Sequence, residues 1–141
     1  MRRTHWYNSA MEQKVDTQQS AHILMIDDDE MLLRLFGAKL SAEGFNVIYA
    51  RNGNEGREIA RRMHPDLILL DIRMPDVDGF TIAHRLHTDA ITKDIPVLFL
   101  TNEDFSPEAE KYAKESIVAD YVHKSIDLDE LVEKIKKHLS Q

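Results

Sequence analysis

The sequence predicts an α/β fold: a five-stranded parallel sheet, doubly wound, with helices on both faces. Short continuous apolar runs, such as residues 67–70 and 96–100, are typical of strands that are buried on both faces. These runs alternate with segments of helical periodicity, and that alternation indicates parallel strands joined by right-handed crossovers. The length of 141 residues, 43% of them hydrophobic, is enough for one domain with a substantial core.

Strands and helices are expected in strict alternation. The strands are predicted at residues 23–26, 45–50, 67–70, 96–100 and 120–123. The helices are predicted at residues 31–40, 54–63, 80–87, 106–115 and from 127 to about 139. Apolar residues recur near the helical period in the first and last helices, whereas the fourth helix has only Ala109, Tyr112 and Ala113 to bury. We therefore expect the fourth helix to be loosely held.

Turn and capping residues mark where the helices begin and end. Gly44 is expected to end the first helix in a left-handed conformation. Asn54 is interpreted as the N-cap of the second helix, and Ser106, ahead of a proline, as the N-cap of the fourth. Asp127 and Glu130 have the spacing of a capping box at the start of the last helix.

Composition narrows the range of functions. Residues 1–20 are polar without lasting periodicity, so we predict a flexible N-terminal extension at 1–20 and one domain at 21–141. The absence of cysteine excludes disulfides and thiolate metal sites, and the lack of a secretion signal also fits a cytoplasmic protein. No apolar run approaches the ~20 residues that span a bilayer, so we expect no membrane insertion. A net charge of -7 argues against direct binding of nucleic acid.

Polar residues follow the strands at one edge of the predicted sheet. Asp27 and Asp28 follow the first strand, Asp71 the third, Thr101 the fourth and Lys124 the fifth. Because the carboxyl ends of parallel strands lie along the same edge, their loops bring these side chains to one rim. Taken alone, Asp71 reads equally well as a strand-end acid that faces water. The acidic run after the first strand also reads as a solvated N-cap cluster for the next helix.

These residue types, if they meet, have a definite chemistry. If Asp28 and Asp71 lie about 4 Å apart, two bare carboxylates repel by about 4 kcal/mol at an effective dielectric of about 20, so one holds a proton or a cation lies between them. Oxygen ligands without histidine favour Mg²⁺ or Mn²⁺ over zinc. A carboxylate in this position can accept a phosphoryl group as an aspartyl phosphate. Lys124 and Thr101 could then bind the phosphate oxygens.

Four motifs carry a family resemblance. Ile-Asp-Asp-Asp lies after the first strand, Leu-Asp-Ile-Arg-Met-Pro-Asp-Val-Asp-Gly at the third, Phe-Leu-Thr at the fourth and Asp-Tyr-Val-His-Lys at the fifth. In this order and spacing, over about residues 21–141, they resemble the receiver domain of bacterial two-component response regulators. The resemblance implies a flavodoxin-like fold with strand order 2-1-3-4-5, and a stand-alone receiver without an output domain.

The resemblance also implies roles for individual residues. Asp71 would accept a phosphoryl group from a histidine kinase or a histidine phosphotransfer protein. Lys124 would hold that phosphoryl group. The implied ligands of Mg²⁺ are Asp27 through water, Asp28, Asp71 and the backbone carbonyl of Arg73.

A switch on one face is implied as well. Thr101 and Tyr121 would be the pair that reorients on phosphorylation, although a strand tyrosine also fits a core or interface position. Receivers respond by a population shift on the face built from the fourth helix, fifth strand and fifth helix, where a downstream protein would bind. The domain would be a signalling module and not an enzyme, catalysing only its own phosphorylation and dephosphorylation.

Two other functions remain open at this stage. One is a pseudo-receiver that acts as an interaction module without phosphorylation. The other is a Mg²⁺-dependent phosphatase that forms an aspartyl phosphate, although Arg73 stands where such an enzyme needs a second acid.

Some positions depart from the family's usual pattern. Ser125 stands where proline is usual, and residues 117–119 replace the common Gly-Ala turn. Asn102 is bulkier than the usual residue after the threonine and is expected to narrow the access of phosphate. The seven histidines lack metal-ligand spacing, and His123 is expected to point outward.

Overall fold

The computed structural model describes residues 20–102 and 107–140, so the predicted N-terminal extension lies almost wholly outside it. Within these ranges strands and helices alternate along the chain. The elements are β1 (His22–Ile26), α2 (Glu30–Ala42), β2 (Asn46–Ala50), α3 (Gly53–Met63), β3 (Leu67–Asp71), α4 (Gly79–Thr88), β4 (Val97–Thr101), α5 (Pro107–Lys114), β5 (Asp120–His123) and α6 (Leu128–Leu139). The predicted alternation is confirmed, with element ends close to those predicted.

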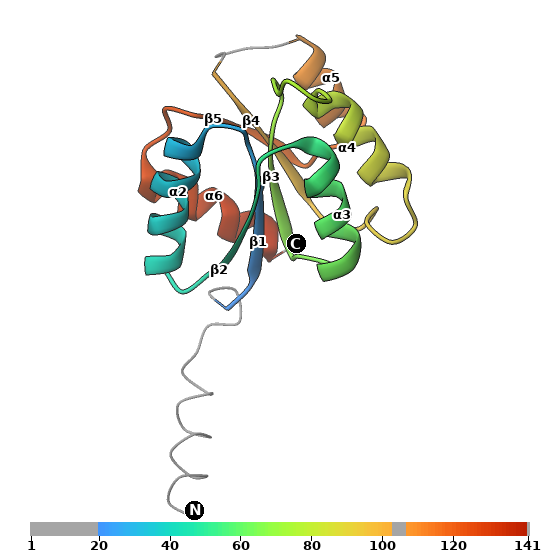
Figure 1. Ribbon diagram of the computed structural model, residues 1–141. Helices are drawn as coiled ribbons and strands as arrows, with labels where there is room; N and C mark the ends of the chain where they lie inside the picture. The colour runs from blue at the N-terminus through green and yellow to red at the C-terminus, as the bar shows by residue number, and fades with distance from the viewer. Residues whose placement is uncertain (1–19, 103–106, 141) are drawn as a thin grey trace, which may run out of the picture.

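The strands form one parallel sheet in the order β2-β1-β3-β4-β5, so the predicted topology is confirmed. Figure 1 shows α2 and α6 on one side of the sheet and α3, α4 and α5 on the other. Because all strands point the same way, each loop that follows a strand lies at the same edge of the sheet. β3 lies in the middle, between β1 and β4.

Side chains of the central strands alternate between two hydrophobic cores. Met25 packs into the core on the side of α2 and α6, with Phe36 and Ile135. Leu70 packs into the core on the other side, with Ile82 of α4. All residues of β3 are buried, which is what its uninterrupted apolar run predicts.

Several helix ends lie where the sequence predicts them. Gly44 follows α2 with a φ of 96°, so its left-handed conformation is confirmed. Asp127 caps α6 and accepts hydrogen bonds from the N–H groups of Asp129 and Glu130. The predicted cap at Ser106 falls outside the described residues.

The prediction that Asn54 caps the second helix is wrong. The cap is Asn52, whose side chain accepts a hydrogen bond from the N–H of Glu55 at 2.8 Å. The helix begins at Gly53, one residue before the predicted cap. Asp76, from the loop after β3, accepts the N–H groups of Gly53 and Asn54 at 3.3 and 3.4 Å. A long-range contact therefore stabilises this helix start, and the local sequence does not reveal it.

Two apolar residues of α2 point away from the core. Met31 and Leu35, which fit the helical spacing, are 79% and 53% exposed. Leu33 takes part in the core instead. The buried face of α2 is therefore rotated from the one that spacing alone indicates.

The fourth helix of the chain, α5, is sparsely anchored, as predicted. Ala109 is its one fully buried residue. Tyr112 supplies the main further contact, with its ring centroid 5.0 Å from that of Phe80 and 5.9 Å from that of Phe99. A helix with so little buried apolar surface can shift at a lower cost than its neighbours.

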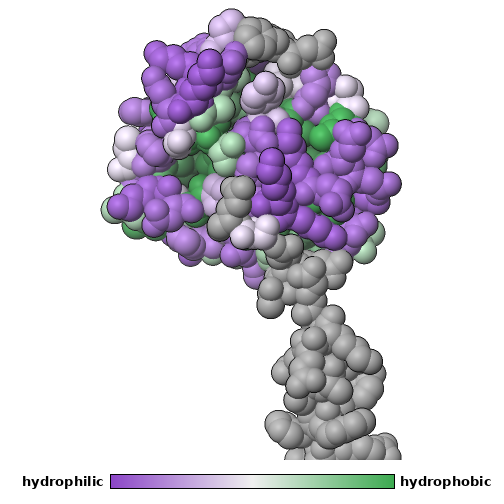
Figure 2. Space-filling model, turned by 180° about the vertical axis from the view of Figure 1, so that it is seen from behind, coloured by the Kyte–Doolittle hydropathy of each residue, from purple (hydrophilic) through white to green (hydrophobic). Residues whose placement is uncertain are grey.

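The surface agrees with a domain whose apolar residues are mostly internal. Seen from behind in Figure 2, hydrophilic residues cover most of the visible face and hydrophobic ones form smaller patches. Across the described ranges, no helix has the length and apolar character needed to cross a bilayer.

Gly79 lies where the start of α4 passes the end of β3. Its N–H donates a hydrogen bond to the carbonyl of Ile72 at 2.7 Å. A Cβ at this position would overlap the carbonyl oxygen of Asp71 and lie 2.6 Å from Cα of Ile72. Only glycine lets the two backbones approach this closely.

We therefore expect Gly79→Ala to lower the free energy of unfolding by about 1–3 kcal/mol, because the added methyl group meets backbone that cannot move freely. Gly37→Ala is the matched control, since its methyl group would meet the hydroxyl end of Tyr49, an exposed side chain that can move aside. Urea denaturation of the wild type and both variants measures the difference. Equal losses of stability in the two variants would contradict this reading of Gly79.

Candidate functional site

The carboxyl edge of the sheet brings together acids from two strands and a lysine from a third. Asp71 is the last residue of β3, and Asp27 directly follows β1, the neighbouring strand. Lys124 directly follows β5, two strands from β3. Its N–H donates to the carbonyl of Thr101 at 2.8 Å, which continues the pairing of β5 with β4 and fixes the backbone of Lys124 beside the end of β4.

The acidic run after β1 was predicted either to cap the next helix or to form part of a site. Asp29 and Asp27 take these two roles separately. Asp29 is the N-cap of α2 and accepts the N–H groups of Met31 and Leu32 at 3.0 and 3.2 Å. Asp27 is fully buried, and its Oδ1 accepts the N–H of Asp29 at 2.8 Å. The run is therefore both a helix cap and part of the site.

The ammonium of Lys124 lies between two buried carboxylates. Its Nζ is 3.0 Å from Oδ2 of Asp27 and 3.1 Å from Oδ1 of Asp71. The lysine side chain is 11% exposed, and the side chains of Asp27 and Asp71 are 0% and 4% exposed. Ion pairs this poorly solvated are screened little by salt, so they hold the three side chains in place.

This environment changes the proton affinity of both partners. Burial raises the pKa of Asp71 to about 7, and the charge of Asp27 adds to the rise while Lys124 and the N–H of Arg73 oppose it. Burial lowers the pKa of Lys124, but its contacts with Asp27 and Asp71 outweigh that effect, so its pKa is raised overall. The lysine therefore stays charged while Asp71 can gain a proton near neutral pH.

The acids at this edge fit a divalent cation. Asp27, Asp28 and Asp71 can each offer an oxygen so that these atoms lie within 4.8 Å of one another. The side chain of Asp28 is exposed to water. Oδ2 of Asp71 is buried and has no hydrogen-bond partner among the described residues, a costly state for an acceptor that a cation would relieve. An all-oxygen donor set is the kind that Mg²⁺ prefers.

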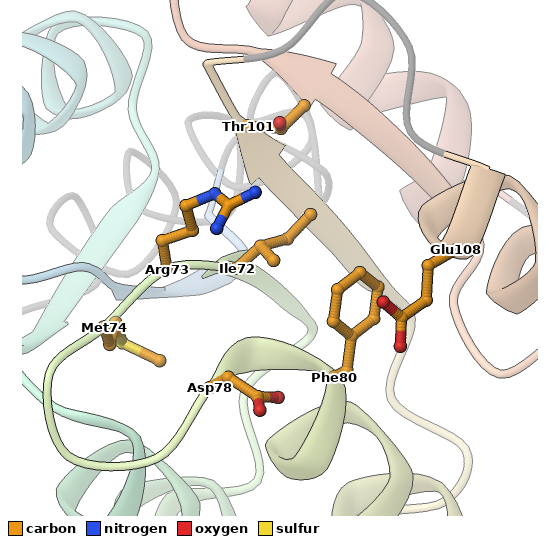
Figure 3. Close-up of a pocket in the computed structure, with 7 residues that line it drawn as sticks. All are labelled: Ile72, Arg73, Met74, Asp78, Phe80, Thr101 and Glu108. Carbon is orange, nitrogen blue, oxygen red and sulfur yellow. The ribbon is translucent and has the colours of Figure 1, made fainter.

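Two cavities adjoin Asp71 and share Ile72, Arg73 and Thr101. The smaller, of about 220 Å³, lies over the carboxylates, and its described lining is completed by Asp28, Asp29, Asp71, Asn102 and Lys124. The larger, of about 550 Å³, extends toward α4 and α5, with Met74, Asp78, Phe80 and Glu108 in its described lining (Figure 3). The candidate chemistry belongs to the smaller cavity because it contains the acids and the lysine.

The remaining predicted site residues take different positions. Thr101 is 7% exposed at the end of β4 and lines both cavities. The side chain of Arg73 is exposed, and its N–H donates to Oδ1 of Asp71 at 3.3 Å. Tyr121 is half-buried against the core on the side of α3, α4 and α5, away from the acids. The metal-ligand role of the Arg73 carbonyl and the switch role of Thr101 and Tyr121 stay predictions.

Sequence reasoning missed His123, which does not simply point outward. Its Nε2 lies 3.0 Å from the carbonyl oxygen of Asn102. Its Nδ1 accepts the N–H of Ser125 at 3.0 Å. The signal available was weak: a histidine beside the lysine and a residue other than proline after it. The partner on Asn102 comes from another loop and could not be read locally.

Comparison with known proteins places this geometry in a family. The sequence model described as "Response regulator receiver domain" matches residues 23–136. The chain belongs to this family. Receivers of this family are signalling modules of two-component systems that interact with histidine kinases or phosphotransfer proteins, and they bind Mg²⁺ at an acidic pocket.

Curated relatives differ in how much of their length this receiver matches. It is 32% identical over 117 residues to the polar-differentiation response regulator DivK of Brucella ovis, covering 83% of this chain and 94% of DivK. It is 31% identical over 125 residues to the transcriptional regulatory protein GlrR of Escherichia coli K12, covering 89% of this chain but only 28% of GlrR. Similar receivers thus occur both as nearly the whole of a protein and as a minor part of one.

Solved structures agree with the assignment. The N-terminal domain of a response regulator receiver protein from Methanoculleus marisnigri JR1 is 38% identical with a TM-score of 0.70, covering 86% of this chain and 98% of that one. A CheY-like response regulator receiver domain protein from Methanospirillum hungatei JF-1 is 26% identical with a TM-score of 0.79, covering 86% and 94%.

The raised pKa of Asp71 predicts that ionising this carboxyl weakens the receiver fold. A carboxyl whose pKa is 3.8 when unfolded and about 7 when folded binds its proton more tightly in the folded state. Stability is therefore lost as the pH rises from about 4 to about 7. Without divalent cations, we expect Asp71→Asn to be more stable than the wild type by about 2 kcal/mol near pH 8, and by much less near pH 5.

Urea denaturation at the two pH values measures this difference. Asp94→Asn is the control, since Asp94 is an exposed acid that precedes β4, at the edge of the sheet opposite Asp71. A stability gain in Asp71→Asn that is the same at both pH values would show that removal of charge is not its cause.

Proposed function

We propose that this receiver accepts a phosphoryl group on Asp71 from a histidine kinase or a histidine phosphotransfer protein, in a Mg²⁺-dependent reaction, and thereby switches the binding of a partner. The observation that carries the proposal is the state of Asp71. Its Oδ2 is buried beneath a cavity without a hydrogen-bond partner in the described part of the chain, and its Oδ1 is held by Lys124 at 3.1 Å. One oxygen is thus oriented while the other is left for chemistry.

The transfer needs few groups from the protein. An oxygen of the Asp71 carboxylate forms a bond to phosphorus, and the bond from phosphorus to the donor's histidine nitrogen breaks, so the histidine leaves with that electron pair. Lys124 and the hydroxyl of Thr101 bind oxygens of the transferred group. The raised pKa of Asp71 means that ionisation of the nucleophile near neutral pH depends on positive charge nearby.

The metal ligands we propose are Asp28 and Asp71 directly, Asp27 through water, and the backbone carbonyl of Arg73. Bound there, Mg²⁺ would balance the charge on the carboxylates and on the incoming phosphate. Mn²⁺ has similar oxygen preferences and could substitute. The spacing of the three acids within 4.8 Å supports this set.

The response would appear on the face formed by α5, β5 and α6. Thr101 and Tyr121 lie on β4 and β5, where both side chains face the same side of the sheet as α5. We propose that Thr101 moves toward the phosphoryl group and that Tyr121 reorients with it. The weak anchoring of α5 supports a shift of that helix, which would present a changed surface to a downstream protein.

Two specific features weigh between the alternatives. A phosphatase would need an acid two residues after Asp71, and Arg73 stands there with an exposed side chain. A pseudo-receiver needs no intact site. Here the ammonium of Lys124 lies within 3.1 Å of both Asp27 and Asp71, although Ser125 stands in the place of proline. The phosphoacceptor function uses all of these contacts.

Incubation with acetyl phosphate and Mg²⁺ tests the phosphoacceptor. We expect a phosphoryl mass gain on the wild type that EDTA abolishes, since the charge-balancing cation is removed. Asp71→Asn should gain nothing, and Lys124→Met should gain it at least about tenfold more slowly, because a charge-assisted contact is lost. Equal gain in the wild type and Asp71→Asn would reject Asp71, and no gain in the wild type would favour the pseudo-receiver.

Hydrogen–deuterium exchange tests the proposed switch. With beryllofluoride and Mg²⁺ as a phosphoryl mimic, we expect altered exchange in α5 and β5 and little change in α3. Asp71→Asn is the control and should not respond. A response in the wild type restricted to the loops around Asp71 would contradict the proposed output face.

A further inference from the structure

The side chain of His123 bridges two loops that carry proposed phosphate-binding residues. Its Nε2 lies 3.0 Å from the carbonyl oxygen of Asn102, in the loop after β4. Its Nδ1 lies 3.0 Å from the backbone nitrogen and 2.6 Å from the hydroxyl oxygen of Ser125, in the loop after β5. The imidazole ring thus joins the residue after Thr101 to the residue after Lys124.

The two backbone partners dictate which ring nitrogen carries hydrogen. A backbone N–H only donates, and a carbonyl oxygen only accepts. Nδ1 must therefore be the unprotonated nitrogen that accepts from Ser125, and Nε2 must carry the hydrogen that is donated to Asn102. A neutral ring with hydrogen on Nε2 satisfies both contacts, and the Ser125 hydroxyl can also donate to Nδ1. An imidazolium would set one N–H against another at Ser125.

Main-chain bonds place this ring where it can control the lysine. His123 is the β5 residue in register with Thr101 of β4. The N–H of Lys124 donates to the carbonyl of Thr101 at 2.8 Å, and the N–H of Ile126 donates to the carbonyl of His123 at 3.0 Å. The ring of His123 is hydrogen-bonded to Ser125, and Lys124 is the single residue between these two. The backbone of Lys124 is therefore held on both sides.

Ser125 is part of this arrangement because of its backbone. Proline has no N–H, so it could not donate to Nδ1 of His123. The serine supplies both that N–H and a hydroxyl, each within 3.0 Å of the ring nitrogen. In this protein the loop after β5 is thus restrained by hydrogen bonds between His123 and Ser125, in place of the rigid ring of a proline.

We propose that His123, as a neutral imidazole with hydrogen on Nε2, is a positioning residue that clasps the backbones of Asn102 and Ser125 and so holds the ammonium of Lys124 at Asp71. This role rests on the proposed function, because one of its measured effects is on the rate of phosphoryl transfer to Asp71. A lysine side chain is long and flexible, so its ammonium is placed accurately only where its Cα is fixed. Small misplacements of a reacting group slow reactions strongly.

Isosteric variants separate the two halves of the clasp. In His123→Asn the side-chain oxygen can still accept from the N–H of Ser125, as in an Asx turn, but the side chain is too short to reach Asn102. In His123→Gln the amide nitrogen can still donate toward Asn102, but Ser125 loses its acceptor. His123→Phe keeps a ring and loses both contacts. His87→Gln, at an exposed position on α4, is the matched control.

The first readout is the rate at which acetyl phosphate and Mg²⁺ label the protein. We expect labelling of His123→Phe to slow about tenfold, because two hydrogen bonds are lost. Labelling of His123→Asn and of His123→Gln should slow about threefold, because each loses one. His87→Gln should keep the wild-type rate. Circular dichroism checks that each variant is folded, and partial rescue in His123→Asn or His123→Gln relative to His123→Phe separates positioning from a loss of packing.

The second readout does not need phosphorylation. Near pH 8, where an imidazole is ordinarily neutral, the ¹⁵N NMR shifts of the ring report which nitrogen carries hydrogen. We expect hydrogen on Nε2 of His123, and an ammonium signal of Lys124 that is protected from exchange in the wild type and lost in His123→Phe. Hydrogen on Nδ1, or a Lys124 signal unchanged in His123→Phe, overturns the clasp.

The two readouts distinguish failure of the clasp from failure of the proposed function. If the wild type takes up no phosphate but His123 and Lys124 give the expected signals, the phosphoacceptor function fails and the clasp stands. If the wild type is labelled and His123→Phe is labelled at the same rate, the phosphoacceptor stands and the clasp fails.

Discussion

The receiver is built around one buried cation held between two buried acids. The ammonium of Lys124 lies 3.0 Å from Asp27 and 3.1 Å from Asp71, and all three side chains are largely withdrawn from water. Because β3 and β4 lie between β1 and β5, the lysine side chain has to extend across the ends of both strands to reach Asp27. The bond from the N–H of Lys124 to the carbonyl of Thr101 continues the pairing of β5 with β4 and fixes the backbone from which that side chain extends.

The same trio leaves an electrostatic imbalance that a ligand can relieve. Charged acids that have lost their water are costly even when paired, and here two carboxylates share one ammonium. Desolvation and mutual repulsion therefore raise the pKa of Asp71 toward neutrality, and no hydrogen-bond donor within residues 20–102 and 107–140 meets its Oδ2. A divalent cation beside Asp28 would stabilise the ionised form of Asp71. We expect this arrangement to lower the stability of the fold and to favour the binding of a divalent cation at the site.

Much of the fold could be predicted because its signals are local. The apolar run that ends in Asp71 predicted a fully buried strand, and Gly44 predicted the end of a helix. The shared edge of a parallel sheet then brought Asp27 and Lys124 into the same site. What sequence reasoning missed depends on partners that are distant in the chain. Asn54 was assigned the role that Asn52 takes, and the further contact that stabilises that helix start comes from Asp76, on another loop.

His123 illustrates the same limit at the site itself. A histidine next to Lys124 on an edge strand is ordinarily solvent-facing, and nothing in the adjacent residues indicates the carbonyl of Asn102 as its partner. Likewise, Ser125 stands where the family usually has proline. The structure instead has a hydrogen-bonded turn in that position, with the N–H of Ser125 on Nδ1. Substitution at a motif position therefore need not weaken a site when a neighbouring side chain takes over the restraint.

The double pairing of Lys124 has a consequence for the proposed reaction. When Asp71 becomes an acyl phosphate, its own carboxylate charge is lost and the new negative charge lies on phosphate oxygens farther out. A lysine paired with Asp71 alone would lose its partner at that moment and could swing toward solvent. Because Asp27 lies 3.0 Å from the same ammonium and is fully buried, the ammonium of Lys124 retains one partner throughout the reaction. In the proposed reaction we expect Lys124 to follow the phosphate by a small rotation, and Thr101, whose carbonyl accepts the N–H of Lys124, to move with it.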